Sequence, residues 1–234
     1  MRGARPPDLV AHGGVAPREP PGMTALAAAL LAAAGAVAVA DWVAKARRSP
    51  ARRLLKPAVP VLLIGVALSV EPVVAAQVPF VVVGLALGLA GDVVLLRRGS
   101  ARLPLGALLF GAGHLAYLAG FAVRQAAGGG AVLIAVLAVA TVLAARSFLP
   151  AAYREGGRRL AGIVVAYLAV LAALLLGAVL GGGWLAVAGA ATFWASDLLL
   201  LHARFVGSVR AFDLAATVTY HLAQGAIVGS LVVG

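Results

Sequence analysis

Two aspartates stand alone in long apolar stretches of the sequence. Asp92 lies in GLAGDVVLL and Asp197 in FWASDLLLL, although only 8 of the 234 residues are acidic. A carboxylate inside the hydrocarbon of a membrane costs about 2.5–3.5 kcal/mol on insertion scales, so it usually marks chemistry, an ion path or a hydrogen bond between helices. When two carboxylates share a site, burial and like charge both disfavour ionisation. The pair therefore favours a functional site over two separate helix contacts.

Other apolar stretches carry polar side chains at helical spacing. His114 and Tyr117 are three residues apart in GAGHLAYLAGF, and Tyr220 and Gln224 are four apart in TVTYHLAQGA, so each pair shares one helix face. His221 points away from that face. Each of these residues alone is typical of a hydrogen bond between helices, but together with the aspartates they fall at similar depths. That convergence indicates a shared site.

The composition is that of a membrane protein. The chain is 63% apolar and 12% charged, with a mean hydropathy of +1.04, whereas soluble proteins carry about 25% charged residues. Uncharged stretches of roughly 20 residues, enough to cross ~30 Å of hydrocarbon, recur along the chain. We expect an all-α fold, a bundle of eight transmembrane helices. The predicted spans are 24–43, 57–73, 76–96, 104–123, 130–147, 160–180, 184–203 and 211–232.

The chain before the first span has a different composition. Residues 1–22 are rich in Pro, Gly and Arg and predict a disordered tail, followed by one transmembrane domain of residues 23–234. Ala38-Val39-Ala40 superficially fits a signal-peptidase site, but the basic cluster that follows is typical of a retained helix.

Prolines and glycines mark the expected ends of the spans. Pro57 and Pro104 suit the first turn of a helix. The triplets 128–130 and 181–183 are all glycine and predict tight turns between helices.

The basic residues indicate the orientation. Fifteen of the 19 Lys and Arg residues lie in or beside the loops after the first, third, fifth and seventh spans. The positive-inside rule places these loops in the cytoplasm and both termini outside it, and we expect a bacterial inner-membrane protein. Asp92 lies five residues before Arg97 and Asp197 seven before Arg204. Both carboxylates should then lie roughly 7–11 Å inside the cytoplasmic boundary.

Four motifs carry a family resemblance. GDVVLL, FGAGHLAYLAGF, ATFWASDLLLL and YHLAQ, in this order, resemble the YhhN-like family of integral membrane proteins, which includes the lysoplasmalogenases. The resemblance runs from about residue 24 to the C-terminus, and Lys56-Pro57 fits it too. The pair Tyr220-His221 departs from the two aromatic residues expected there, and the long basic tail is a second departure.

The resemblance implies a membrane enzyme that hydrolyses the vinyl-ether bond of lysoplasmalogens to a fatty aldehyde and a glycerophospho head group. The family's paired aspartates correspond to Asp92 and Asp197, which we expect to be catalytic. Lys56, at the interface, is expected to meet an anionic head group. The expected substrate-binding residues are His114, Tyr117, Ser196, Tyr220, Gln224 and Lys56.

This chemistry suits two carboxyl groups. Proton transfer to carbon creates an oxocarbenium ion, water adds to it, and the hemiacetal collapses to aldehyde and alcohol. One carboxylic acid must supply the proton and a second carboxylate must stabilise positive charge or activate water, as at glycosidic bonds. The sequence leaves open which aspartate has which role. We expect no metal or cofactor, and the expected partners are the lysophospholipid and the bilayer, not nucleic acid.

The alternative is a proton-coupled transporter of a small molecule or lipid, with the aspartates as a proton relay. Broken helices near the membrane centre in both halves would favour it, and none is evident.

Other hydrolases fit less well. The sequence has no cysteine, no Gly-x-Ser-x-Gly and no His-Glu-x-x-His, and no base is placed to activate Ser196. An aspartyl protease would need Gly-x-Gly-Asp where the chain has Leu89-Ala90-Gly91-Asp92.

Overall fold

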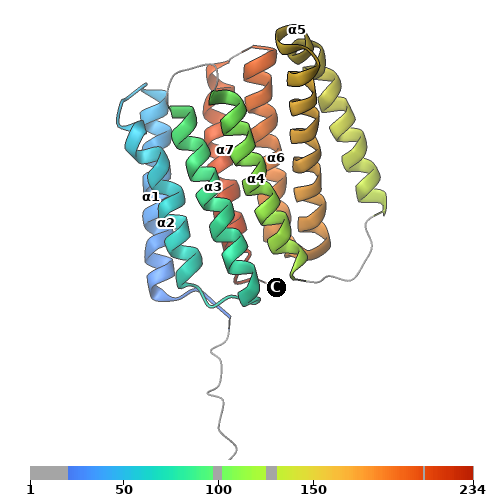
Figure 1. The fold of residues 1–234 in the computed structure, drawn as a ribbon. Helices are drawn as coiled ribbons and strands as arrows, with labels where there is room; N and C mark the ends of the chain where they lie inside the picture. Colours follow the sequence, from blue (N-terminus) through green and yellow to red (C-terminus); the bar gives the residue numbers. More distant parts are fainter. Residues whose placement is uncertain (1–20, 97–101, 125–130, 208, 234) are drawn as a thin grey trace, which may run out of the picture.

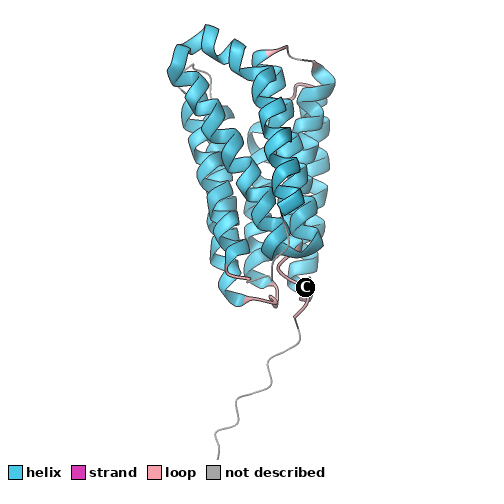
Figure 2. Cartoon of the chain, turned by 90° about the vertical axis from the view of Figure 1, so that its right-hand side faces the viewer, coloured by secondary structure: helices cyan, strands magenta, loops and turns pink. Residues whose placement is uncertain are grey.

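The structure, a computed structural model, describes residues 21–96, 102–124, 131–207 and 209–233. Within these residues the secondary structure is helical, apart from one antiparallel bridge between Gly22 and Glu71. Figure 1 shows the helices side by side in a bundle, and Figure 2 shows the bundle from a second side. The helices are α1 (Ala25–Ala46), α2 (Arg52–Ser69), α3 (Val78–Leu96), α4 (Arg102–Ala122), α5 (Ala131–Gly177), α6 (Gly183–Phe205) and α7 (Arg210–Gly229), with short helical turns at Ala75–Gln77 and Ala178–Gly182.

Helix α5 consists of two arms that meet at a break. Gly156 (φ −139°, ψ 18°) and Gly157 (φ 61°, ψ −154°) leave the helical conformation. A positive φ is open to glycine because it has no Cβ. The chain turns back at this point, so the two arms lie side by side in Figure 1. The sequence predicted the reversal but also a long loop at 148–159, whereas the helix continues through most of that segment.

Four stretches of the described residues are long and apolar enough to cross a membrane. They are Ala25–Ala46, Ala75–Leu96, Pro104–Ala122 and Ala140–Phe205, the last of which contains both the break in α5 and the turn before α6. The chain is therefore an all-helical membrane protein. The count of eight spans and the placement of both termini outside the cytoplasm stay predictions.

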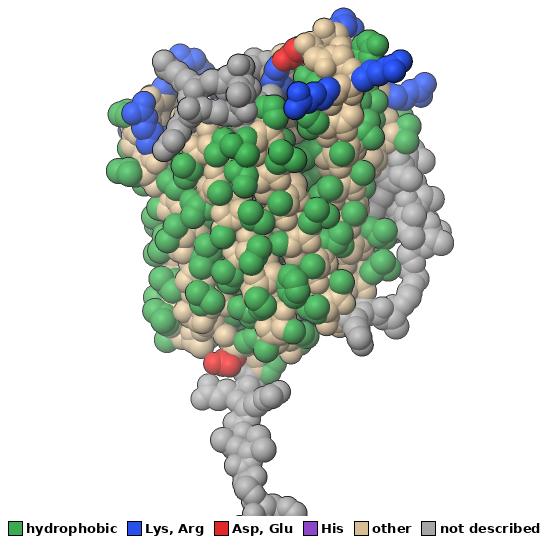
Figure 3. Space-filling model, in the orientation of Figure 1, with side chains coloured by type: hydrophobic (Ala, Val, Ile, Leu, Met, Phe, Trp, Pro, Cys, Tyr) green, Lys and Arg blue, Asp and Glu red, His purple; other side chains and the backbone are tan. Residues whose placement is uncertain are grey.

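Charge gathers at the ends of the bundle. Apolar side chains cover the long face in Figure 3, and Lys and Arg lie at the end that holds the α1–α2 loop and the break in α5. The C-terminus lies at the opposite end (Figure 1). There Arg124 donates to the main-chain oxygens of Gly182 (3.1 Å), Ser230 (2.9 Å) and Val233 (2.9 Å). A cation at the carboxyl ends of helices satisfies their free carbonyl groups.

The predicted helix starts were right at one proline and wrong at the other. Pro104 lies in the first turn of α4. Pro57 lies inside α2, which begins at Arg52 because the helix extends past the apolar stretch and over the basic residues. An apolar run marks the part of a helix that lies in hydrocarbon, and not where its hydrogen bonds begin.

The predicted turn at 181–183 is confirmed, since a π-helical turn at Ala178–Gly182 precedes Gly183 with φ 71°. The turn predicted at 128–130 lies outside the described residues, as do residues 1–20 of the predicted tail. The described Gly22 pairs with Glu71 through two main-chain hydrogen bonds of 2.8 and 3.0 Å.

Helix α7 brings the polar residues of other helices together. It packs against α1, α2, α3 and α6. Its approach to α6 is close, because a Cβ at Gly189 would lie 2.8 Å from Cγ1 of Ile227. Small residues at such crossings let the backbones of membrane helices come together. Side chains of α2 and α3 therefore meet side chains of α7 inside the bundle.

Candidate active site

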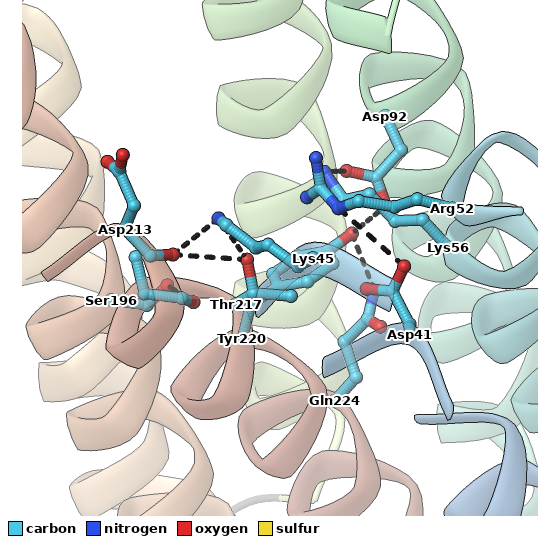
Figure 4. A network of polar contacts seen from close by, with 11 residues as sticks. Asp41, Lys45, Arg52, Lys56, Asp92, Ser196, Asp213, Thr217, Tyr220 and Gln224 are labelled. Atoms are coloured by element: carbon cyan, nitrogen blue, oxygen red, sulfur yellow. Dashed lines mark hydrogen bonds and ion pairs between the residues drawn. The ribbon is translucent and has the colours of Figure 1, made fainter. Parts of the chain in front are cut away.

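Asp92 lies within a chain of polar contacts that joins three helices. Its side chain, on α3, is fully buried. Lys56 of α2 forms an ion pair with it, with 2.5 Å between Nζ and Oδ1. The Tyr220 hydroxyl of α7 donates to Oδ2 over 3.0 Å, and the Gln224 amide donates to the Tyr220 oxygen over 2.9 Å. Figure 4 shows these contacts. Each oxygen of Asp92 faces a donor, an arrangement that suits a carboxylate.

Asp197 of α6 has different partners. The Tyr167 hydroxyl, from the second arm of α5, donates to its Oδ2 over 2.6 Å. His114 Nε2 of α4 lies 3.9 Å from the same oxygen, which is beyond hydrogen-bond distance. The His114 ring is held edge-on against Phe193, with 4.9 Å between ring centroids. In the described residues, no lysine or arginine forms an ion pair with Asp197.

The two aspartates line one polar cavity of about 80 Å³ at the basic side of the bundle. This volume is enough for several waters. Cations and hydroxyls share its wall with a few apolar side chains. The lining residues are Lys45, Arg52, Lys56, Asp92, Leu95, Phe110, Asp197, Leu200, Ala216, Thr217 and Tyr220. The structure therefore brings the two aspartates, which are distant in the sequence, to one cavity.

An apolar groove of about 110 Å³ adjoins the polar cavity. Asp197 and Phe110 line both spaces, so the carboxyl group stands where they meet. Leu160, Ile163 and Val164 of α5 supply much of the groove wall, and Tyr167 lines it next to Asp197. A hydrocarbon chain in this groove would pass directly by the Asp197 carboxyl group.

A second, much smaller cavity of about 10 Å³ lies against the other polar residues. His114, Tyr117, Tyr220 and Gln224 line it, and its volume is close to that of one water. His114 Nδ1, the Tyr117 hydroxyl and Gln224 Oε1 have no hydrogen-bond partner among the described residues. The site thus offers polar atoms that a water or a substrate oxygen can bond.

A model of the YhhN family matches residues 51–231 of the chain. The chain belongs to the YhhN family. No curated protein and no solved structure matches it. The match covers α2 to α7, and hence Asp92, Asp197 and the helices that carry their partners.

Most of the predicted site residues of this YhhN protein lie together. Asp92, Lys56, Tyr220 and Gln224 form one chain of contacts, while Asp197 and His114 lie on the other side of the shared cavity. Tyr117 lines the small cavity next to His114.

Two predicted residues lie differently from the expectation. Ser196 is buried and donates to the Ala216 carbonyl oxygen over 2.8 Å, which ties α6 to α7. It lines neither the polar cavity nor the groove. Lys56 was expected at an anionic head group and instead pairs with Asp92 inside the bundle. His221 lines none of the cavities described above, and its Nδ1 accepts from Trp42 Nε1 over 3.0 Å.

The sequence did not single out Tyr167, Lys45 or Arg52 as site residues. Tyr167 sits in an ordinary apolar stretch, 30 residues before its partner Asp197, and no spacing rule links the two. Lys45 and Arg52 belong to a basic cluster that resembles a topology signal. Among the described residues, no group of three or more His, Asp or Glu side chains is arranged to hold a metal ion.

Proposed function

We propose that the protein hydrolyses the vinyl-ether bond of lysoplasmalogen-type lysophospholipids, releasing a fatty aldehyde and a glycerophospho head group. One observation carries the proposal: two buried aspartates with different partners line one cavity, large enough for several waters, that adjoins an apolar groove. Membership of the YhhN family, which includes lysoplasmalogenases, supports it. A vinyl ether needs this combination, because its hydrocarbon chain is apolar and its hydrolysis consumes a water.

Asp197 is the proposed general acid. Its Oδ2 accepts from Tyr167, and it borders both the groove and the polar cavity. Asp92 is the proposed ionised partner, because Lys56 and Tyr220 each direct a donor at it. Two carboxyl groups in unlike surroundings can divide the acid role from the charge-stabilising role.

The proposed reaction balances with these two groups. The Asp197 carboxyl proton adds to the vinyl carbon that does not carry the oxygen, and the ether oxygen stabilises the resulting cation. Asp92 lowers the energy of this positive charge from across the cavity. Water then adds to the oxocarbenium carbon and gives up a proton to Asp197. The hemiacetal carbon–oxygen bond breaks as its hydroxyl loses a proton and the glycerol oxygen gains one.

The decisive experiment measures aldehyde release from a 1-alkenyl-glycerophosphocholine by purified protein in detergent. We expect release by the unmodified chain and a fall in kcat of about 10²–10⁴-fold for Asp197→Asn, the usual contribution of a general acid. Circular dichroism and thermal melting should show that the variant remains folded. A folded unmodified chain that releases no aldehyde, yet moves protons with a solute across proteoliposomes, would instead establish the transporter.

Asp92 needs a paired design. Asp92→Asn leaves Lys56 as a buried cation without its carboxylate, and breaking a buried pair costs about 3–5 kcal/mol. The double variant Asp92→Asn with Lys56→Met removes both charges, so we expect it to fold better than Asp92→Asn alone and to stay inactive. If the double variant regains activity, Asp92 serves only to neutralise Lys56.

A further inference from the structure

A basic opening lies beside the candidate site, at the end of the bundle that carries the positive charge. It is a cavity of about 770 Å³ between the end of α1 and the start of α7. Cavities that bind small ligands have about this size. Its lining contains three cations and one carboxylate, in the residues Lys45, Ala46, Arg48, Arg210, Ala211, Asp213 and Leu214.

Lys45 connects this opening to the aspartates. Its side chain lines both the opening and the polar cavity of Asp92 and Asp197. Its Nζ donates to two uncharged oxygens, the main-chain oxygen of Asp213 and, over 2.6 Å, the Thr217 hydroxyl. Figure 4 shows the Lys45 amine next to both oxygens. The charge of Lys45 therefore faces space from which an anion can approach.

Arg52 is a second cation with an N–H group that lacks a hydrogen-bond acceptor in the described part of the chain. Its Nε forms an ion pair with the buried Asp41, 3.6 Å from Oδ1, but this distance is too long for a hydrogen bond, and Nε is buried without a hydrogen-bond partner among the described residues. The side chain is 26% exposed and lines the polar cavity. A guanidinium presents paired N–H groups that match the oxygens of a phosphate.

The backbone brings a third cation to the rim. Arg48, with φ 55°, is the one non-glycine residue of the described chain with a positive φ. Such a conformation costs about 1–3 kcal/mol and persists where the surroundings hold it. Arg48 sits in the tight turn between α1 and α2 and lines the opening together with Arg210.

We infer that this opening, with Lys45 at its base, binds the phosphodiester of a lysophospholipid, whose hydrocarbon chain then passes Asp197 into the apolar groove. The inference rests on the proposed function and assigns the head-group end of its substrate. Cations line the opening, and the groove that Asp197 also lines is apolar apart from Arg204, so the two spaces suit the phosphate and the hydrocarbon chain of a lysophospholipid. Lys45, Arg48 and Arg210 supply the positive charge of the opening, and Arg52 adds to it from the adjoining polar cavity.

The test compares two cleavable substrates, a 1-alkenyl-glycerophosphocholine and the matching 1-alkenylglycerol, which lacks the phosphate. We expect the unmodified protein to prefer the phospholipid in kcat/KM, and Lys45→Gln with Arg210→Gln to reduce that preference at least about tenfold, as the loss of hydrogen bonds to a charged group predicts. A general folding defect lowers both rates and leaves the ratio unchanged. Arg53→Gln removes an exposed charge next to Arg52 that lines neither cavity, and should keep the preference.

A binding arm separates this inference from the proposed function. A 1-O-alkyl-glycerophosphocholine has a saturated ether that no vinyl-ether hydrolase cleaves, and its affinity can be measured in nanodiscs against 1-O-alkylglycerol. The phospholipid could bind more tightly than the alkylglycerol, and Arg210→Gln could weaken that binding, while no substrate releases aldehyde. That result would support the opening as the phosphodiester site and would reject the hydrolase proposal. Equal binding of both ethers overturns the inference, whether or not aldehyde is released.

The last arm distinguishes a lipid from a soluble ligand, with inorganic phosphate as the competitor. We expect millimolar phosphate to leave binding of the alkyl lysophospholipid within about twofold, because the chain in the groove adds affinity that a free ion lacks. Displacement of the lipid by phosphate would mean that the opening serves a soluble anion, and would overturn the assignment. Arg210 is exposed, so Arg210→Gln carries the test if Lys45→Gln does not fold.

Discussion

The two aspartates have different partners, and a Tyr167 variant measures what the partner of Asp197 contributes to the proposed reaction. Tyr167 donates to Asp197 over 2.6 Å. Tyr167→Phe removes this donor and keeps the ring in the groove wall. As the proposed acid gives up its proton it becomes a carboxylate, and a hydrogen bond to a charged group is worth about 1.5–3 kcal/mol. We therefore expect kcat for aldehyde release to fall by roughly ten- to a hundredfold.

The matched control is Tyr153→Phe on the other arm of α5, where the side chain is 56% exposed. It makes the same chemical change without touching either aspartate, and should leave kcat and the melting temperature as they are. Unchanged kcat in Tyr167→Phe would mean that the hydroxyl plays no part in positioning the acid.

Residue types were easier to predict than residue partners. Asp92 and Asp197 stood out because a lone carboxylate is rare among apolar residues, and the shared face of Tyr220 and Gln224 follows from helical spacing. The ion pair of Lys56 with Asp92 depends on how α2 packs on α3, which no local pattern encodes. Long-range contacts of this kind are set by the bundle as a whole.

At the scale of the helix, hydropathy predicted an all-helical membrane protein but not where its helices end. The segment PAAYREGG is polar enough to be interpreted as a loop, yet it is helical up to Gly156. Helices continue past the hydrocarbon boundary because their hydrogen bonds are internal and do not depend on apolar surroundings. Two adjacent glycines, and not the polar residues, determine where α5 breaks.

A pair of glycine substitutions in α5 tests that explanation. Gly157 has φ 61°, whereas Gly162 is helical, and a Cβ added at either would meet nothing within 4 Å. Gly157→Ala should destabilise the protein by about 1–3 kcal/mol, because the strain is in the backbone itself. Gly162→Ala should stabilise it by about 0.5–1 kcal/mol through helix propensity.

The measurement is the melting temperature of each variant in the same detergent. Neither new methyl group makes a steric contact. A lower melting temperature for Gly157→Ala and a higher one for Gly162→Ala can therefore only reflect backbone conformation. If the melting temperature of Gly157→Ala equals or exceeds that of the unmodified protein, α5 turns back without a left-handed residue at this position.

Over the whole molecule, the site connects three spaces of different polarity. A basic opening leads to a polar cavity with two aspartates, and an apolar groove leads on from Asp197. Basic side chains mark the same end of the bundle on its surface (Figure 3). A lysophospholipid in the leaflet at that end has its phosphate at the interface and its first chain atoms just below. A cytoplasmic placement of this end would therefore commit the proposed hydrolase to lipids of the cytoplasmic leaflet.

That placement is testable because the chain contains no cysteine. Arg53→Cys introduces an exposed thiol at the basic end, and Glu71→Cys introduces one at the far end of α2. If basic loops face the cytoplasm, a membrane-impermeant maleimide should label Glu71→Cys in intact spheroplasts and Arg53→Cys only after lysis. The unmodified chain should take no label, and both variants should label equally once denatured. The reverse pattern would place the basic opening, and with it the supply of substrate, on the outer leaflet.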